Sequence, residues 1–296
     1  MANRITGSEG LFGKVSTKVL RVAGSSIPSY RGTSHYVRST GGSNSNNGKS
    51  WDKAFLTLQY ALTKVNDYDT IWLVGRFDTL SASIPAGLDF LSIIGGGYGS
   101  NVAHLENNGE GAPVLTVNAK GFYAENLYIE APSDSAGLKF SRTAGDINAD
   151  HATLVNVRFW TGKYGVELSG APHNFHWHGG EVRNMRASGA VGLYVSSAAQ
   201  DDAKKALVEN VIFQGNVTHV QGAFTDSVFR RCSFSHAASG NNDTTLQLDL
   251  SAGNSNLVTE NQLAGTYDIA GGYRAGTDDN WNGNYGSSGI TSGVPA

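Results

Sequence analysis

Residues 50–65 read SWDKAFLTLQYALTKV, and two short apolar segments follow them, DTIWLV at 69–74 and FLSIIGGG at 90–97. In the first segment, apolar side chains recur at intervals of three and four residues. This spacing predicts an amphipathic helix, with Ser50 as its N-cap. The two later segments are β-branched and aromatic and end near turn residues, which predicts β-strands. The order of elements is therefore one helix followed by two strands.

The part of the chain that follows contains a repeat. The tetrapeptide Asn–apolar–any–apolar, with Arg replacing Asn in its last copy, recurs every 21 to 30 residues. A second tetrapeptide, Gly–apolar–any–apolar, recurs every 27 or 28 residues between the copies of the first. Two interleaved repeats of similar period predict a solenoid with one turn per repeat. The first repeat begins at Asn126, Asn156, Asn184, Asn210 and Arg231, and the second begins at Gly137, Gly165 and Gly192.

We therefore predict an all-β solenoid with an extended N-terminal arm. The helix and the strands that follow it resemble the entry to a right-handed parallel β-helix of the pectin-lyase-like superfamily, which implies that fold and an N-terminal capping α-helix over the unpaired edge of the first turn. Alternation within each tetrapeptide directs its two apolar residues inward and the residue between them outward. Asn and Gly tolerate the left-handed backbone of a sharp bend, and stacked Asn side chains can hydrogen-bond between turns. A β-sandwich is the alternative, but the hairpin signals that it requires are nearly absent from the repeat region.

The predicted organisation has four parts. They are an assembly arm and loop at 1–49, a capping helix and lead-in at 50–70, the β-helix at 71–265, and a Gly/Asn-rich tail or cap at 266–296. The arm is basic while the body is acidic, so we expect it to dock on a partner, with a disordered tail as the alternative. The basic residues assigned to docking are Arg4, Lys14, Lys18 and Arg21.

Composition limits the classes of function. Charged residues make up 16% of the chain and the net charge is −3, so electrostatics gives no reason to expect a nucleic-acid partner. No apolar run reaches the ~18 residues that a membrane span requires. The first residues lack the apolar region of a secretory signal, so we expect synthesis in a cytoplasm.

The predicted outward positions show no two carboxylates in successive turns, and the sequence therefore favours a role without catalysis. Glycoside hydrolysis requires a carboxylate pair, and Glu167 and Glu181 are the residues that would serve if such a pair assembled between turns or subunits. His176 and His178 share a strand face, but no third ligand accompanies them, so we predict neither metal nor cofactor.

Four aromatic residues are predicted to be exposed. Such side chains can stack on sugar rings, or they can lie in a subunit interface, where Tyr and Trp are enriched. The sequence leaves both interpretations open. These residues are Tyr128, Trp160, Trp177 and Tyr194.

The helix, the Asn and Gly repeats, the basic arm and the Gly/Asn-rich tail together resemble bacteriophage virion proteins built on a pectin-lyase-like parallel β-helix. That resemblance implies a homotrimer in a virion, with the arm binding other virion proteins and the shaft facing solvent or host surface polysaccharide. The chain is short for an enzymatic tail spike, which favours a non-catalytic spike, fibre or decoration protein. The alternatives are a polysaccharide depolymerase, either lyase or glycosidase, and a free glycan-binding β-helix module.

Overall fold

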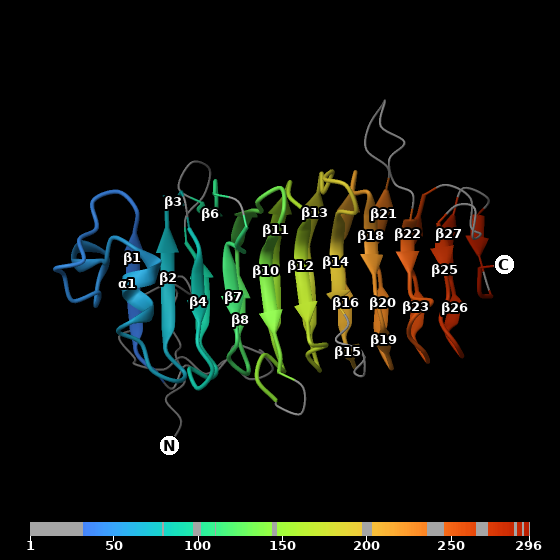
Figure 1. The fold of residues 1–296 in the computed structure, drawn as a ribbon, viewed down its shortest axis with the longest axis horizontal. Helices are drawn as coiled ribbons and strands as arrows, with labels where there is room; N and C mark the ends of the chain where they lie inside the picture. The colour runs from blue at the N-terminus through green and yellow to red at the C-terminus, as the bar shows by residue number, and fades with distance from the viewer. Residues whose placement is uncertain are drawn as a thin grey trace, which may run out of the picture.

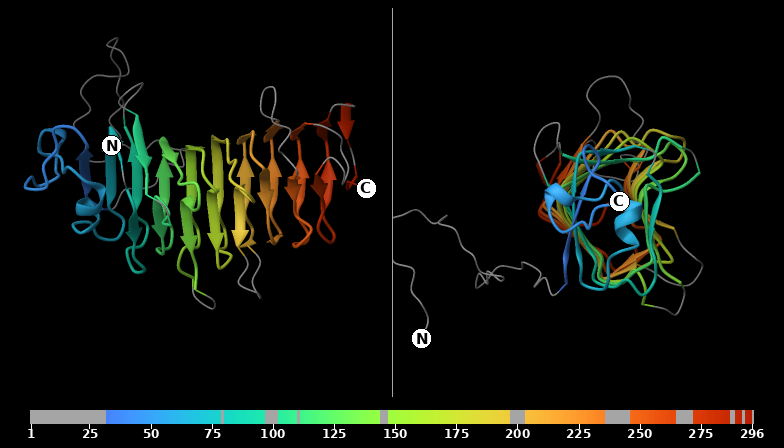
Figure 2. Two further views of the ribbon diagram at one scale, coloured as in Figure 1. Left: turned by 45° about the horizontal axis from the view of Figure 1, so that its top comes forward. Right: turned by 90° about the vertical axis from the view of Figure 1, so that its left-hand side faces the viewer.

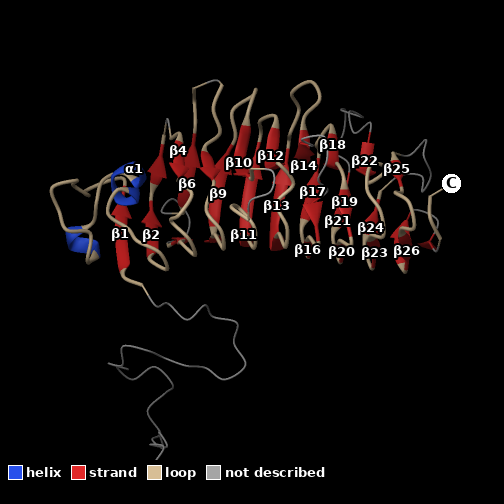
Figure 3. Ribbon diagram, turned by 60° about the horizontal axis from the view of Figure 1, so that its bottom comes forward, coloured by secondary structure: helices blue, strands red, loops and turns tan. Residues whose placement is uncertain are grey.

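The computed structural model is a parallel β-solenoid, so the predicted all-β parallel β-helix is confirmed (Figure 1). The structure describes residues 32–78, 80–96, 102–109, 111–143, 147–196, 203–235, 246–264, 272–286, 289–291 and 293–295. Within these residues, strand follows strand along one axis, and helices occur only at the N-terminal end (Figure 3). No helix in this described part of the chain is long and apolar enough to cross a membrane.

Each turn of the solenoid presents up to three strand faces (Figure 2). Buried apolar side chains fill the interior between them. Faces 1 and 2 belong to one 18-stranded sheet, because β11 and β13 run across both, and face 3 is an 8-stranded sheet. Face 1 consists of β1 (Ser34–Arg38), β2 (Thr70–Val74), β5 (Ser92–Gly95), β8 (Tyr123–Glu125), the first halves of β11 (Thr153–Trp160) and β13 (His176–Arg183), β16 (Leu207–Glu209), β20 (Val228–Arg230), β23 (Leu257–Thr259) and β26 (Asn280–Asn282).

Face 2 follows face 1 in each turn after a sharp bend. It carries the second halves of β11 and β13 together with β3 (Arg76–Phe77), β6 (Ala103–Glu106), β9 (Leu127–Glu130), β17 (Ile212–Gln214), β21 (Ser233–Ser235), β24 (Gln262–Leu263) and β27 (Asn284–Gly286). Face 3 consists of β4 (Ala82–Ile84), β7 (Leu115–Val117), β10 (Ala136–Ser141), β12 (Tyr164–Ser169), β14 (Val191–Ser196), β18 (Thr218–Gln221), β22 (Leu246–Asp249) and β25 (Tyr273–Arg274). A separate parallel pair joins β15 (Ala203–Lys204) to β19 (Phe224–Thr225).

The bend between faces 1 and 2 requires left-handed backbone, as the sequence predicted. Asn126, Asn156 and Asn210 occupy it with φ of 55°, 50° and 58°. The Asn156 side chain donates a 2.7 Å hydrogen bond to the Asn126 side chain of the preceding turn. These polar stacks fix the register of successive turns.

One copy of the predicted repeat was wrongly placed. Asn184 lies after β13 and outside any strand, and the bend of that turn is formed instead by Gly179 and Gly180. Arg186, predicted to be an outward strand residue, therefore lies off the strand. Glu181 takes that place, in register with Arg158. The error arose because loops of unequal length separate the turns, so a constant period cannot follow the strands.

The predicted capping helix is shorter than its apolar spacing indicated. It divides into a 3₁₀ turn at Trp51–Lys53 and the helix α1 (Leu58–Leu62), whose N-cap is Thr57 rather than Ser50. Phe55, between the two, is extended and exchanges backbone hydrogen bonds of 2.9 Å with β1. The edge of β1 would otherwise lack partners, so strand pairing overrides helix propensity there. Leu58 of α1 still enters the core, as a cap requires.

The solenoid also extends beyond the predicted limits at both ends. β1 pairs in parallel with β2, so the first turn begins at Ser34, inside the segment expected to be an arm and loop. At the other end, β26 and β27 pair in parallel with β23 and β24, inside the expected tail. β28 (Gly289–Thr291) then pairs antiparallel to β27. The docking residues Arg4, Lys14, Lys18 and Arg21 lie outside the described residues.

Candidate active site on face 2

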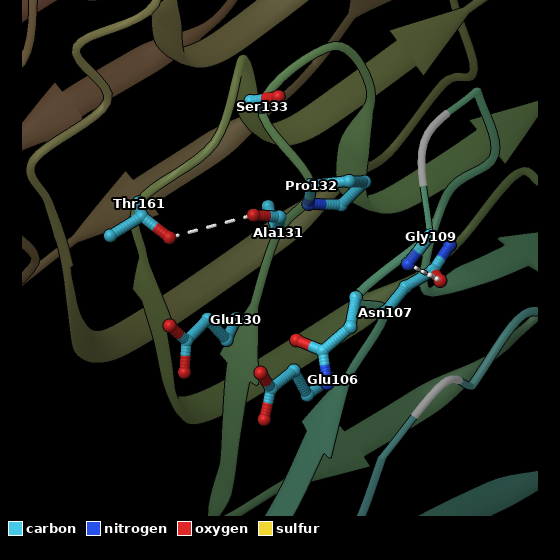
Figure 4. Close-up of a pocket in the computed structure, with 9 residues that line it drawn as sticks. Glu106, Asn107, Gly109, Glu130, Ala131, Pro132, Ser133 and Thr161 are labelled. Atoms are coloured by element: carbon cyan, nitrogen blue, oxygen red, sulfur yellow. Dashed lines mark hydrogen bonds between the residues drawn. The ribbon is translucent and has the colours of Figure 1, made fainter.

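Two carboxylates lie side by side on successive turns of face 2. Glu106 ends β6 and Glu130 ends β9, and the two residues are direct partners in the parallel register. Both side chains point outward because each strand alternates, with Leu105 and Ile129 fully buried beneath them. In the close-up, the two carboxylates project in the same direction (Figure 4).

A second row of functional side chains runs two residues earlier along the same strands. His104 pairs in register with Arg76 on one side and with Tyr128 on the other. The His104 and Tyr128 rings meet edge to face, with centroids 4.6 Å apart. His104 Nε2 lies 3.3 Å from the Glu130 carboxylate and 3.9 Å from that of Glu106. Imidazole, phenol and two carboxylates thus converge at one place.

Arg76 forms an ion pair with Glu106. Its guanidinium forms an ion pair with the Glu106 carboxylate and a second one with Asp78 at 2.5 Å. The Glu106 side chain is only 8% exposed, whereas the Glu130 side chain is 32% exposed. The two carboxylates therefore differ in environment, one buried and ion-paired, the other open to solvent.

Burial lowers the pKa of His104, and the nearby charge of Arg76 lowers it further, while Glu106 and Glu130 oppose both effects. His104 is therefore neutral near pH 7, and it can both donate and accept a proton. Burial also raises the pKa of Tyr128, and the charges of Glu130 and Glu181 raise it further. The Tyr128 hydroxyl is consequently a hydrogen-bond donor rather than a phenolate at neutral pH.

A cavity of about 220 Å³ opens beside the carboxylates. Its rim is formed by the loops that follow β6 and β9, where Gly109 donates a 2.9 Å hydrogen bond to the Asn107 side chain (Figure 4). Thr161 reaches the Ala131 carbonyl at 3.5 Å from the next turn. The volume is below the ~300–1,000 Å³ of typical ligand pockets, so the cavity suits one unit of a polymer lying along the face. The cavity is lined by Glu106, Asn107, Asn108, Gly109, Glu130, Ala131, Pro132, Ser133 and Thr161.

His104, Glu106 and Glu130 could also hold a metal ion, since one ligand atom from each lies within 4.8 Å of the others. A histidine with two carboxylates is a donor set that divalent transition metals accept. The Arg76 guanidinium, however, already neutralises Glu106 and would repel a second cation. The contacts therefore fit proton transfer and nucleophilic chemistry better than metal binding.

Two of the four aromatic residues singled out in the sequence belong to this site. Tyr128 contacts His104, and Trp160 pairs in register with Glu130. Tyr194 lies on face 3, where it stacks on Tyr164 at 4.8 Å. Trp177 was predicted to be exposed, and this prediction is wrong, because the alternation of β13 places it in the core at 0% exposure.

The two carboxylates singled out in the sequence do not come together. Glu167 lies on face 3, where Lys139 Nζ at 3.1 Å and the Ser196 hydroxyl at 3.0 Å contact its carboxylate. Glu181 lies on face 2, two turns beyond Glu130, with Arg183 at 2.6 Å. Neither residue belongs to a carboxylate pair among the described residues.

The expectation that no two carboxylates align in successive turns is therefore wrong. Sequence reasoning missed Glu106 because β6 lacks the Asn at its head by which the other turns were aligned. A signal was present, since the tetrapeptides Ala-His-Leu-Glu at 103–106 and Leu-Tyr-Ile-Glu at 127–130 share an apolar–any–apolar–Glu pattern. Searching for that pattern would have aligned the two carboxylates.

Comparison with known proteins supports the fold. No protein-family model and no curated protein sequence matches the chain. Among solved structures, it is similar to the GH136 lacto-N-biosidase from Eubacterium ramulus, with a TM-score of 0.63 and 12% identity over 86% of this chain and 56% of that one. The chain thus spans a little over half the length of that enzyme.

Two further solved structures are also similar to most of this chain. An alginate lyase from a Paenibacillus species has a TM-score of 0.58 and 16% identity, over 81% of this chain and 96% of the lyase. Pectin methylesterase from carrot has a TM-score of 0.55 and 12% identity, over 89% and 86% of the two chains. At these identities the similarity establishes the pectin-lyase-like β-helix fold alone, and nothing in it indicates a bacteriophage origin.

Proposed function

We propose that the protein is a polysaccharide-degrading enzyme that hydrolyses glycosidic bonds at Glu106 and Glu130. The observation that carries the proposal is the register of these two carboxylates beside a cavity on an open face. The sequence favoured a non-catalytic role because it revealed no carboxylate pair in successive turns. Glu106 and Glu130 form such a pair, so that argument against catalysis no longer holds. The similar solved structures include enzymes whose names refer to saccharides, which supports the same choice.

The separation of the carboxylates favours a particular stereochemistry. One oxygen of each lies within 4.8 Å of the other. Retaining glycosidases hold their two carboxyl groups ~5–5.5 Å apart, whereas inverting enzymes leave ~6.5–9.5 Å for a water molecule. The pair therefore fits the double-displacement route, in which one carboxylate attacks the sugar directly.

The surroundings assign the two roles. Glu106 is the nucleophile, because its ion pair with Arg76 fixes the orientation of its carboxylate. Glu130 is the acid and base, because it is the more exposed carboxylate and water can reach it between steps. Glu130 protonates the departing sugar oxygen as Glu106 bonds to the anomeric carbon. It then takes a proton from the water that releases the sugar. His104 and Tyr128 lie at the same place and orient the sugar hydroxyls.

Replacement of either carboxylate tests the proposal. Glu106→Gln and Glu130→Gln should each lower hydrolysis by about 10³-fold or more, since each removes one chemical step. Reducing-end release from a panel of neutral and acidic polysaccharides measures the loss, and proton NMR of the first product shows whether the anomeric configuration is retained. The matched control is Glu260→Gln, an exposed carboxylate paired with Arg231 that should leave activity unchanged.

Thermal unfolding of each variant must match that of the wild type, so that lost activity is not lost structure. Full activity in both carboxylate variants would disprove the proposed site. An unsaturated product that absorbs ultraviolet light would identify a lyase instead, the other chemistry considered for this fold.

The setting of the enzyme is a separate proposal. A tail-spike depolymerase in a virion, a homotrimer and a docking arm at Arg4, Lys14, Lys18 and Arg21 are all compatible with the site. A non-catalytic virion protein and a free glycan-binding module remain the competing predictions, and both require that Glu106 and Glu130 can be replaced without loss of function.

A further inference from the structure

Arg158 lies on face 2 one turn beyond the candidate catalytic residues. On β11 it pairs in register with Tyr128 on one side and with Glu181 on the other. Its side chain is exposed, as expected of an outward position. It is therefore in the row that contains His104 and Tyr128, directly after them.

Arg158 differs from its arginine neighbours in its lack of a counter-ion. Arg76 is ion-paired with Glu106 and Asp78, and Arg183 is ion-paired with Glu181 at 2.6 Å. Within the described part of the chain, the Arg158 guanidinium forms no hydrogen bond or ion pair. All five donors of this group are thus available to a ligand.

The spacing of the solenoid relates Arg158 to the cleaved bond. Successive parallel strands lie ~4.8 Å apart, and one hexose unit of an extended polysaccharide has a similar length. A chain lying along face 2 therefore places about one sugar unit over each turn. The unit above β11 is next to the unit above the Glu106–Glu130 pair.

Trp160 completes this position. It lies two residues after Arg158 on the same side of β11 and pairs in register with Glu130. An aromatic ring beside a guanidinium offers a stacking surface for the sugar and a charged fork for a substituent of that sugar. Arginines pair with Glu106 and Glu181, but no arginine that the structure describes pairs with Glu130, whose charge would repel an anionic polymer. Binding of such a polymer therefore requires an uncompensated cation here.

We propose that Arg158 selects a polysaccharide that carries a carboxylate or sulfate on the sugar adjacent to the cleaved bond, and that Trp160 stacks on that sugar. The inference rests on the proposed function, since the neighbouring turn must hold the reacting sugar. Arg158 is a specificity-determining residue in this proposal, and it takes no part in bond cleavage. A planar guanidinium binds both anions through paired hydrogen bonds, so the shared chemistry is an oxyanion.

Binding to the inactive Glu130→Gln protein tests the inference without turnover. The probes are polygalacturonate, alginate and hyaluronan, each paired with its carboxyl-reduced form, and dextran sulfate paired with dextran. We expect at least one acidic polymer to bind 10-fold or more tightly than its neutral counterpart, measured by affinity electrophoresis and calorimetry. The first three pairs report a carboxylate and the fourth a sulfate.

Adding Arg158→Gln should abolish this preference, and Arg158→Lys should keep part of it, because a lysine retains the charge but loses the planar fork. The matched control is Arg231→Gln, an exposed arginine on a bend that is already paired with Glu260. It should leave the preference unchanged. On any acidic substrate that the active enzyme cleaves, Arg158→Gln should raise KM by about 10- to 100-fold and change kcat by much less.

Three results would overturn the inference. They are equal binding of acidic and neutral forms by the Glu130→Gln protein, binding of no acidic probe, and an Arg158→Gln variant that loses affinity for both forms equally. Failure of the proposed function is recognised separately. In that case Glu106→Gln and Glu130→Gln leave hydrolysis unchanged, whatever Arg158 contributes to binding.

Discussion

Glu209 on face 1 has a strongly lowered pKa among the carboxylates that the structure describes. It accepts hydrogen bonds from His178 Nδ1 at 3.0 Å, Arg230 Nε at 2.8 Å and His176 Nε2 at 3.3 Å. Burial raises the pKa of Glu209, but the hydrogen bonds from His178, Arg230 and His176 outweigh burial and lower the pKa to about 2. The two histidines that looked like a metal pair in the sequence are thus bound to a carboxylate of another turn.

We expect Glu209→Gln to lower the free energy of unfolding by about 1–3 kcal/mol at pH 7, because hydrogen bonds to a largely buried charge are lost. The folded-state pKa is depressed, so this stabilisation is complete above the ordinary carboxyl pKa of ~4.3 and disappears as pH falls from there through about 2. Urea unfolding of both proteins between pH 7 and pH 3 measures the difference.

Glu260→Gln is the control for this experiment, since its pair with Arg231 is about half exposed and should contribute little. If the difference in the free energy of unfolding between the wild type and Glu209→Gln stays constant from pH 7 to pH 3, packing and not charge causes the loss of stability.

Individual outward residues could be predicted where the repeat was read correctly. The Asn126 and Asn156 tetrapeptides placed Tyr128 and Arg158 on the surface, and the structure agrees. The sequence did not reveal that Glu106 lies beside Glu130, because β6, the strand that carries Glu106, has no Asn at its head. The prediction for Trp177 was wrong. It was predicted to be exposed, but strict alternation along β13 turns its side chain inward.

Among elements, the bends between faces 1 and 2 show most directly how backbone conformation sets the register of the turns. They require left-handed backbone, and Asn fulfils this at three turns while Gly179 and Gly180 fulfil it at a fourth. Strand positions were predictable because alternation and bend residues are local signals. The slip at Asn184 was not avoidable, because loop lengths between faces differ from turn to turn and carry no periodic signal.

Gly180 tests the importance of these bends. It has φ of +97°, and an added Cβ would collide with the backbone carbonyl of Val157 in the preceding turn. Gly180→Ala should therefore lower the free energy of unfolding by more than the ~1–3 kcal/mol of left-handed strain alone. Gly87 has φ of +86° and nothing within 4 Å of an added Cβ, so Gly87→Ala reports the strain without the collision. If urea unfolding shows that Gly180→Ala and Gly87→Ala lose the same free energy of unfolding, a steric role for Gly180 is excluded.

At the scale of the whole molecule, the candidate catalytic and binding residues that the structure describes lie in part of face 2. From β3 to β13, the outward residues of face 2 include arginines, acids, His104, Tyr128 and Trp160. Beyond β13 the same register continues through neutral side chains, beginning with Ile212 and Ser233. A solenoid permits this because each turn contacts mainly its neighbours, so a site can occupy a few turns while the others extend the shaft.

The predicted homotrimer must leave the site on face 2 accessible. Face 1 offers a surface through which subunits could contact one another without covering face 2. Its outward side chains include an aliphatic row in register on three successive turns, Leu207, Val228 and Leu257. All three are only half-buried within one subunit. Burying such a row between subunits is favourable, and apolar residues are typical of the centre of a subunit interface. We therefore expect the three subunits to pack through face 1.

Native mass measurement tests this arrangement. The wild type and a variant lacking residues 1–30 should both be trimers, because assembly would then reside in the β-helix and not in the arm. Val228→Glu should yield monomers that retain the circular dichroism of the fold, since a charge in the centre of an apolar interface costs several kcal/mol. Ser233→Glu, on face 2 of the same turn, should remain a trimer. A monomeric wild type would contradict the trimer, and a trimeric Val228→Glu protein would place the interface on another face.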